Sequence, residues 1–186
     1  MNHLPQDATL IVIDVQQAFN NPAWGTRNNP QAEQHIAMLL AGWRASARPI
    51  IHVHHRSQHP DSHFFEQGPG VRVKPEAAPL DSEPVIYKSV NSSFIGTGLE
   101  ARLRAAGTRT LVVAGITTDH CVSTTVRMAG NFGFDTILAG DATATFDRRG
   151  VQGEYFSADV MYATALASIN GEFARVRSSV DVLAML

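Results

Sequence analysis

The stretch Thr110-Leu-Val-Val-Ala-Gly-Ile-Thr-Thr-Asp-His-Cys121 joins an apolar run directly to a polar turn. Its first five residues have the length and composition of a buried strand. The residues from Thr118 to Asn131 are predicted to form a helix that ends at Gly133. A buried strand that passes through a short turn into a helix is typical of a β–α–β unit, in which neighbouring strands are parallel.

The same alternation of short apolar runs and longer amphipathic runs continues on both sides of this stretch. Strands are predicted at 9–14, 49–54, 85–87, 110–114, 135–139 and 174–177. Helices are predicted at 30–48, 97–106, 118–131, within 153–173, and at 180–186. The first of these helices places Ile36, Leu39, Leu40 and Trp43 on one face. The pattern predicts one α/β domain over residues 1–186, with a mostly parallel sheet and helices on both of its faces.

Composition and charge exclude several classes of protein. The formal net charge of −2 and the absence of a Lys/Arg block give no sign of a nucleic-acid partner. The first apolar run, from Leu10 to Ile13, is only as long as a strand and follows no basic segment, so we expect no signal peptide, no membrane span and a cytoplasmic protein. The single cysteine, Cys121, excludes an internal disulfide and a cysteine-based metal cluster within one chain.

In open parallel sheets, functional residues gather beyond the carboxyl ends of the strands. This rule selects Asp14, the stretch 54–63, Lys88, the turn 115–121 and Asp141. The irregular stretch 56–83 lies partly in this region, and a loop of that length in a compact domain is usually functional or mobile.

Cys121 is predicted to lie in the first turn of a helix. The positive end of the helix dipole stabilises a thiolate there, and the amides of the turn can form an oxyanion hole. The alternative is a buried, inert cysteine. His120 is a poor base for this thiol, because adjacent residues on a helix do not face each other.

Asp14 and Lys88 each follow a predicted strand. A carboxylate at the end of a buried strand is partly desolvated, which raises its pKa and makes it a usable base. Asp14 could instead cap a helix or stabilise a loop. Only one other lysine, Lys74, occurs in the chain, and Lys88 could be an ordinary surface residue or could hold a nearby carboxylate and thiol in their ionised forms.

Five of the eight histidines fall within twelve residues, and such clusters can bind zinc or iron. They are His52, His54, His55, His59 and His63. The first two share one face of a strand, whereas His55 points the other way. No carboxylate lies among the strand histidines, so a metal site would need Asp61 or Glu66 from the loop.

Aromatic residues in the loops near the strand ends could line an apolar substrate pocket. We assign Phe19, Trp24 and Phe94 to this pocket, together with Asn91 in the segment after Lys88. Phe64 and Phe65 lie in the same region. The alternative is that several of these rings, Phe19 and Phe94 among them, only cap the core.

Several motifs together resemble the isochorismatase-like cysteine hydrolase superfamily. The motifs are Ile11-Val-Ile-Asp-Val-Gln-Gln-Ala-Phe19, Tyr87-Lys-Ser through Phe94-Ile-Gly-Thr-Gly-Leu99, Ala114-Gly-Ile-Thr-Thr-Asp-His-Cys-Val122, Gly140-Asp-Ala142 and Leu166-Ala-Ser-Ile-Asn-Gly-Glu-Phe173. Each motif alone is weak, but together they cover nearly the whole chain in the right order. The resemblance implies a three-layer α/β/α fold with a six-stranded parallel sheet.

The resemblance also implies the roles of particular residues. The catalytic Asp–Lys–Cys triad of the family maps onto Asp14, Lys88 and Cys121. A non-proline cis peptide is expected between Ile116 and Thr117, and the amides of Thr117 and Cys121 would form the oxyanion hole. Related hydrolases are dimers or tetramers, so we expect a homo-oligomer, and the apolar tail 180–186 is suited to packing against something.

One departure from the family pattern indicates which class of substrate to expect. Nicotinamidases carry an Asp-x-His pair and a later His as metal ligands after the second strand. Here that region is His54-His-Arg-Ser-Gln-His-Pro-Asp-Ser-His63, in which the Asp expected directly after the strand is absent and the one carboxylate, Asp61, comes later in the loop. We therefore expect no metal and no cofactor. The predicted function is hydrolysis of a carboxamide or related C–N bond of a small molecule through a thioester. The alternatives are hydrolysis of an isochorismate-like vinyl ether with Asp14 as general acid, and a non-catalytic binding module on the same fold.

Overall fold

The computed structural model describes residues 3–186. Six parallel strands form one sheet in the order β3-β2-β1-β4-β5-β8. The strands are β1 (Thr9–Ile13), β2 (Ile50–His55), β3 (Val85–Lys88), β4 (Thr110–Ile116), β5 (Asp135–Ala144) and β8 (Arg175–Arg177). All six were predicted from the sequence, and the parallel sheet is confirmed.

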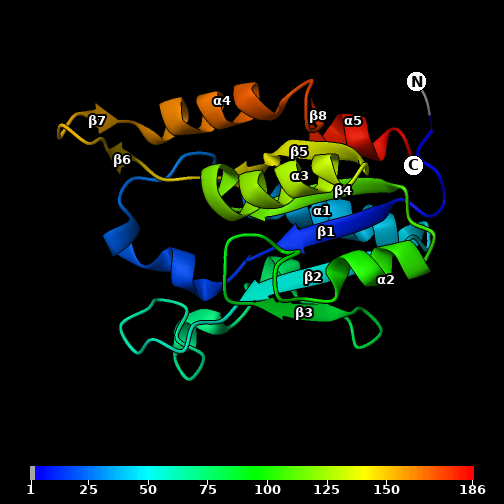
Figure 1. Ribbon diagram of the computed structural model, residues 1–186, viewed down its shortest axis with the longest axis horizontal. Coiled ribbons are helices and arrows are strands. Elements are labelled where there is room, and N and C mark those ends of the chain that lie inside the picture. Colours follow the sequence, from blue (N-terminus) through cyan, green and yellow to red (C-terminus); the bar gives the residue numbers. More distant parts are fainter. Residues whose placement is uncertain (1–2) are drawn as a thin grey trace.

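Helices cover both faces of the sheet (Figure 1). They are α1 (Ala32–Ala45), α2 (Leu99–Ala105), α3 (Ser123–Asn131), α4 (Ala158–Ile169) and α5 (Ser179–Leu183). On β1, Leu10 and Val12 pack with α1 and α5, whereas Ile11 and Ile13 pack with α2, α3 and α4. Because successive side chains of a strand point to opposite faces, a strand in the middle of three layers is apolar at every position.

Two strands end at least two residues later than the sequence indicated. β4 ends at Ile116 rather than at Ala114, and β5 ends at Ala144 rather than at residue 139. Pairing resumes after a register shift, with Gly115 opposite Thr143, so the two strands extend each other.

Asp141 therefore lies inside β5 and not beyond a strand end, as the sequence had suggested. Its carboxylate accepts hydrogen bonds from the amide and the hydroxyl of Ser179, at 2.7 and 2.9 Å. Asp141 thus anchors the start of α5 and is not part of the site described below.

The long connections contain short helical turns. They are η1 (Gln17–Asn20) and η2 (Pro22–Trp24) after β1, and η3 (Pro69–Val71) and η4 (Pro75–Ala77) before β3. Lys74 is buried, and its ammonium lies 2.7 Å from the carboxylate of Glu33 on α1. This ion pair fastens the second connection to the body of the protein.

The apolar tail packs within its own chain, since Leu183 and Leu186 lie against Gly42 of α1. The tail therefore gives no support to an oligomer. Exposed apolar side chains include Val180 at the start of this tail and Val160 on α4. Others lie on the hairpin of β6 (Arg148–Arg149) and β7 (Tyr155–Phe156), which projects beyond the sheet in Figure 1. Among residues 3–186, no helix has the length and apolar character needed to cross a membrane.

Candidate active site

Three side chains from separate strand ends meet at one edge of the sheet. Asp14 follows β1, Lys88 ends β3, and Cys121 lies in the π-helical turn η5 (Thr118–Val122) that follows β4. The ammonium of Lys88 lies 2.6 Å from Oδ2 of Asp14 and 3.3 Å from Sγ of Cys121. β3 is two strands away from β1, at about 4.8 Å per strand, so a long side chain is needed to reach across β2.

Asp14 is completely buried and has a left-handed backbone, with φ of 52°. Asp adopts this conformation more readily than most residues, and it turns the chain sharply at the end of β1. Oδ2 accepts from Lys88, whereas Oδ1 is buried and has no hydrogen-bond partner among residues 3–186. Burial raises the pKa of Asp14, against the opposing effect of Lys88. Oδ1 is thus a buried oxygen free to accept a proton.

Cys121 does not have the stabilised thiolate that its position near a helix start suggested. Burial, followed by the charge of Asp14, raises the pKa of Cys121 to about 12, and Lys88 only partly offsets these effects. Cys121 is 8% exposed, and loss of hydration disfavours the charged form of a thiol. The sulfur therefore keeps its proton in the resting state, within 4.8 Å of a carboxylate oxygen of Asp14.

The turn that carries Cys121 depends on Gly115. This residue has φ of 142°, and a Cβ added to it would meet the carbonyl oxygen of Ile13 at 2.1 Å. Only glycine allows β4 to approach β1 this closely. The peptide bond between Ile116 and Thr117 is cis.

The far end of β5 holds this turn in place, through contacts that the sequence analysis missed. The hydroxyl of Thr118 donates to that of Thr143 at 2.9 Å, and the hydroxyl of Thr145 donates to Asp119 at 2.5 Å. The guanidinium of Arg148 lies 3.2 Å from the other oxygen of Asp119. The sequence could have indicated these contacts through the alternating threonines of Asp141-Ala-Thr-Ala-Thr145. If the strand continues beyond residue 139, both hydroxyls lie on the same side of it.

The five clustered histidines do not converge on one point. The ring of His52 lies 2.9 Å from Glu83, and His54 packs beside His52 and Tyr87. His63 approaches Asn21 at 3.2 Å. His59 is exposed. Only His55 reaches the site.

Asp14, His55 and Cys121 are residue types that can bind a metal ion. One oxygen, one nitrogen and one sulfur atom from these side chains lie within 4.8 Å of one another. The ammonium of Lys88 is within 3.3 Å of all three residues. A cation placed between them would meet this positive charge at contact distance. The residues therefore fit an arrangement in which Lys88 supplies the positive charge, and they do not fit a metal ion.

The residues assigned to the substrate pocket lie in different surroundings. The carbonyl oxygen of the Asn91 side chain is 3.8 Å from the sulfur of Cys121. Phe19 and Trp24 pack together with Phe64, Ile116 and Phe146 beside the nucleophile turn. Phe94 packs against Phe132 and Phe134 within the core beneath α2 and α3. Asn91 thus adjoins the sulfur, and Phe19 and Trp24 belong to an aromatic cluster beside the turn. Phe94 instead packs in the core, which was the alternative for this ring.

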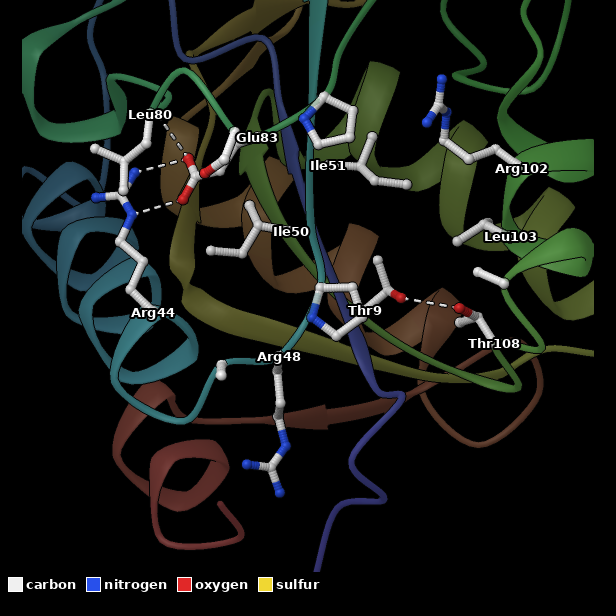
Figure 2. Close-up of a pocket in the computed structure, with 15 residues that line it drawn as sticks. Thr9, Arg44, Arg48, Ile50, Ile51, Leu80, Glu83, Arg102, Leu103 and Thr108 are labelled. Carbon is white, nitrogen blue, oxygen red and sulfur yellow. Dashed lines mark hydrogen bonds and ion pairs between the residues drawn. The ribbon is translucent and has the colours of Figure 1, made fainter.

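A cavity of about 480 Å³ lies at the opposite edge of the sheet, near the amino ends of β1 and β2 (Figure 2). Its walls include Ile50 and Leu103. Arg44 at its rim pairs with Glu83 at 2.7 Å, and Thr9 bonds to Thr108. None of Asp14, Lys88 and Cys121 lines this cavity, so it is separate from the candidate site at the carboxyl edge of the sheet.

Comparison with known proteins shows the family to which the chain belongs. Residues 8–179 match the model of the isochorismatase domain. A crystal structure of an isochorismatase-family protein from Chromobacterium violaceum superposes with a TM-score of 0.96 at 49% identity, covering 100% of this chain and 96% of that one. The isochorismatase family protein YrdC of Bacillus subtilis is 43% identical over 93% of this chain and 92% of its own length. The chain belongs to the isochorismatase family of hydrolases.

One of the matched relatives is a named amidohydrolase. It is the maleamate amidohydrolase of Pseudomonas putida, which is 30% identical over 69% of this chain and 68% of its own length. The family therefore includes an amide-cleaving hydrolase at moderate identity to this chain.

Proposed function

We propose that this protein is a cysteine hydrolase that cleaves a carboxamide or related C–N bond of a small molecule through a thioester intermediate. One observation carries the proposal, namely that the Lys88 ammonium contacts both the carboxylate of Asp14 and the sulfur of Cys121 inside the protein. A buried ammonium that touches both groups stabilises the negative charge wherever it lies while a proton passes between them.

The first half of the reaction forms the thioester. Oδ1 of Asp14 takes the proton of the Cys121 thiol as the sulfur attacks the substrate carbonyl. The backbone amides of Thr117 and Cys121 donate hydrogen bonds to the resulting oxyanion. The tetrahedral intermediate collapses, the C–N bond breaks, and Asp14 returns the proton to the leaving amine or ammonia.

The second half releases the acid. Asp14, again ionised, removes a proton from water, and the hydroxide attacks the thioester carbonyl. The C–S bond breaks, and the sulfur leaves as a thiolate that takes back the proton from Asp14. Lys88 stays protonated throughout and compensates the charge that moves between oxygen and sulfur.

A second candidate reaction is supported by the raised pKa of Asp14, which burial causes. A carboxyl group that keeps its proton to higher pH can act as a general acid toward a vinyl ether such as isochorismate. This reaction does not need the sulfur, so it would survive the loss of Cys121. A non-catalytic binding module on this fold would instead show no turnover with either class of substrate.

The deciding experiment is a screen of small amides for ammonia release, with Cys121→Ala and wild type compared in parallel. We expect the wild type to hydrolyse at least one amide and the variant to lose that activity while folding normally. Amide hydrolysis by Cys121→Ala at the wild-type rate would refute the thioester mechanism. Loss of amide hydrolysis with retained ether hydrolysis would favour the second candidate.

A further inference from the structure

His55 is brought to the site by the sheet itself. It is the last residue of β2, and it pairs with Lys88 in the parallel register of β2 and β3. Residues paired in this way point to the same face of the sheet. Nδ1 of His55 consequently lies 3.2 Å from the ammonium of Lys88.

The backbone of His55 is held from both sides by one buried side chain. The amide oxygen of Gln16 accepts from the His55 N–H at 2.8 Å, and its nitrogen donates to the His55 carbonyl at 3.0 Å. The same nitrogen donates to the carbonyl of Val71 at 3.0 Å. The ring of Phe64 packs on the imidazole, with 5.0 Å between centroids. His55 thus has little freedom to turn away from the site.

The contact with Lys88 determines which ring nitrogen carries the proton. An ammonium can only donate, so Nδ1 must accept and cannot carry a proton. Burial, followed by the charge of Lys88, lowers the pKa of His55 to about 4, so the ring is neutral at physiological pH. A neutral ring with a bare Nδ1 has its hydrogen on Nε2.

The Nε2–H group is a hydrogen-bond donor that has no partner. It donates to no acceptor among residues 3–186. Nε2 is not one of the fully enclosed side-chain atoms that lack a hydrogen-bond partner. His55 is half-buried. This half-buried ring, whose other nitrogen lies beside Lys88, therefore has a donor available for a substrate that binds at Cys121. Donation from Lys88 to Nδ1 also polarises the ring and strengthens the Nε2–H donor.

We propose that His55 binds the substrate through this Nε2–H, and that it selects amides carrying a second acceptor oxygen, carbonyl or carboxylate, near the scissile carboxamide. This inference rests on the proposed amide hydrolysis. When a substrate without that oxygen binds, the Nε2–H donor loses its hydrogen bond to water and gains no new partner. This loss costs binding free energy. His55 is thus a specificity-determining residue and takes no part in proton transfer.

The test uses two variants that separate the two ring nitrogens. His55→Asn keeps an acceptor oxygen at the position of Nδ1 and removes the distal donor. His55→Gln reaches further and keeps a donor near the position of Nε2. The substrates are the monoamides and the diamides of dicarboxylic acids with three to five carbons, each compared with the fatty amide of equal chain length.

We expect the wild type and His55→Gln to prefer the acceptor-bearing amide in kcat/KM by roughly tenfold or more. His55→Asn should lose this preference both for the charged monoamide and for the neutral diamide. The dependence of the Cys121 alkylation rate on pH should stay as in the wild type. Retention of the preference in His55→Asn would overturn the proposal. A shifted alkylation profile in that variant would also overturn it, because His55 would then act through Lys88.

A binding measurement keeps this proposal separate from the proposed function. Calorimetry with the monoamides compares Cys121→Ala with the double variant Cys121→Ala/His55→Asn, and neither protein can form a thioester. Weaker binding by the double variant supports the His55 assignment even if the wild type hydrolyses no amide. Equal binding refutes the assignment even if the wild type is an active amidase.

Discussion

Nζ of Lys88 lies 2.6 Å from Oδ2 of Asp14, and both side chains are fully buried. A buried ion pair at this distance is stable only while both partners are present, since removal of either one leaves an uncompensated charge away from water. The sulfur of Cys121 lies 3.3 Å from the same ammonium. Besides burial, both members of the pair therefore affect the pKa of the thiol, Asp14 by raising it and Lys88 by lowering it. The first two predictions concern these two residues.

Lys88→Met should raise the pKa of the Cys121 thiol by about one unit or more and nearly abolish turnover. The pKa should rise and not fall, because removing a neighbouring positive charge disfavours the thiolate and lowers the thiolate fraction at any given pH. The measurement is the rate of alkylation against pH. The control is Lys74→Met, which removes the other buried lysine, paired with Glu33 away from the sulfur. If Lys88→Met and wild type alkylate with the same profile, Lys88 has no electrostatic role at the sulfur.

Asp14→Asn should move the alkylation profile in the opposite direction. Asp14 raises the pKa of Cys121, so removing its charge lowers that pKa and makes alkylation faster at neutral pH. Turnover should nevertheless fall by roughly 10²–10⁴-fold, because no group remains to carry the proton to the leaving amine. Steady-state rates and alkylation rates on the same preparation check both parts. A variant that alkylates more slowly than wild type would contradict the assignment.

Gly115→Ala should destabilise the protein and disable the site together. Its Cβ would lie 2.1 Å from the carbonyl oxygen of Ile13, at φ of 142°. The strands must separate, at a cost of about 1–3 kcal/mol or more. Urea unfolding measures this loss, and Gly98→Ala serves as the control because it has open space and φ of −91°. Equal stability of the two variants would show that β4 does not need this close approach.

Extensive chelation should leave the activity unchanged. The ammonium of Lys88 occupies the space between Asp14, His55 and Cys121, and the other clustered histidines do not converge. The measurement is amide hydrolysis before and after dialysis against a chelator, with metal content determined on the same samples. Inactive metal-free protein that recovers with zinc, iron or manganese would contradict this expectation.

The protein should form a homo-oligomer through α4. Val160 is 46% exposed on this largely apolar helix, and the exposed rings of Tyr155 and Phe156 lie just before it. Val160→Asp should lower the mass measured by light scattering at micromolar concentration, because a charge in an apolar interface is not compensated. Val180→Asp is the matched control, since α5 packs on the other face of the sheet. A monomeric wild type would refute the expectation.

Apolar periodicity in the sequence determined the elements of the fold. Helix α1 shows this well, since Ile36, Leu39, Leu40 and Trp43 were predicted on one face and are all fully buried. The same reasoning placed Asp14, Lys88 and the Cys121 turn at carboxyl strand ends, because these positions are local features of short apolar runs. It ended β5 too early, since residues 140–144 are held in the sheet by β4 and not by their own apolar pattern.

Only the tertiary structure decided what those residues do to one another. Lys88 and Asp14 are 74 residues apart, and their contact depends on the strand order β3-β2-β1, which no local pattern encodes. The pKa of Cys121 and the bare Nδ1 of His55 likewise follow from burial and from charges on distant strands. Local periodicity reports which face of an element is apolar, whereas ionisation depends on distances between groups that come together only when the sheet is assembled.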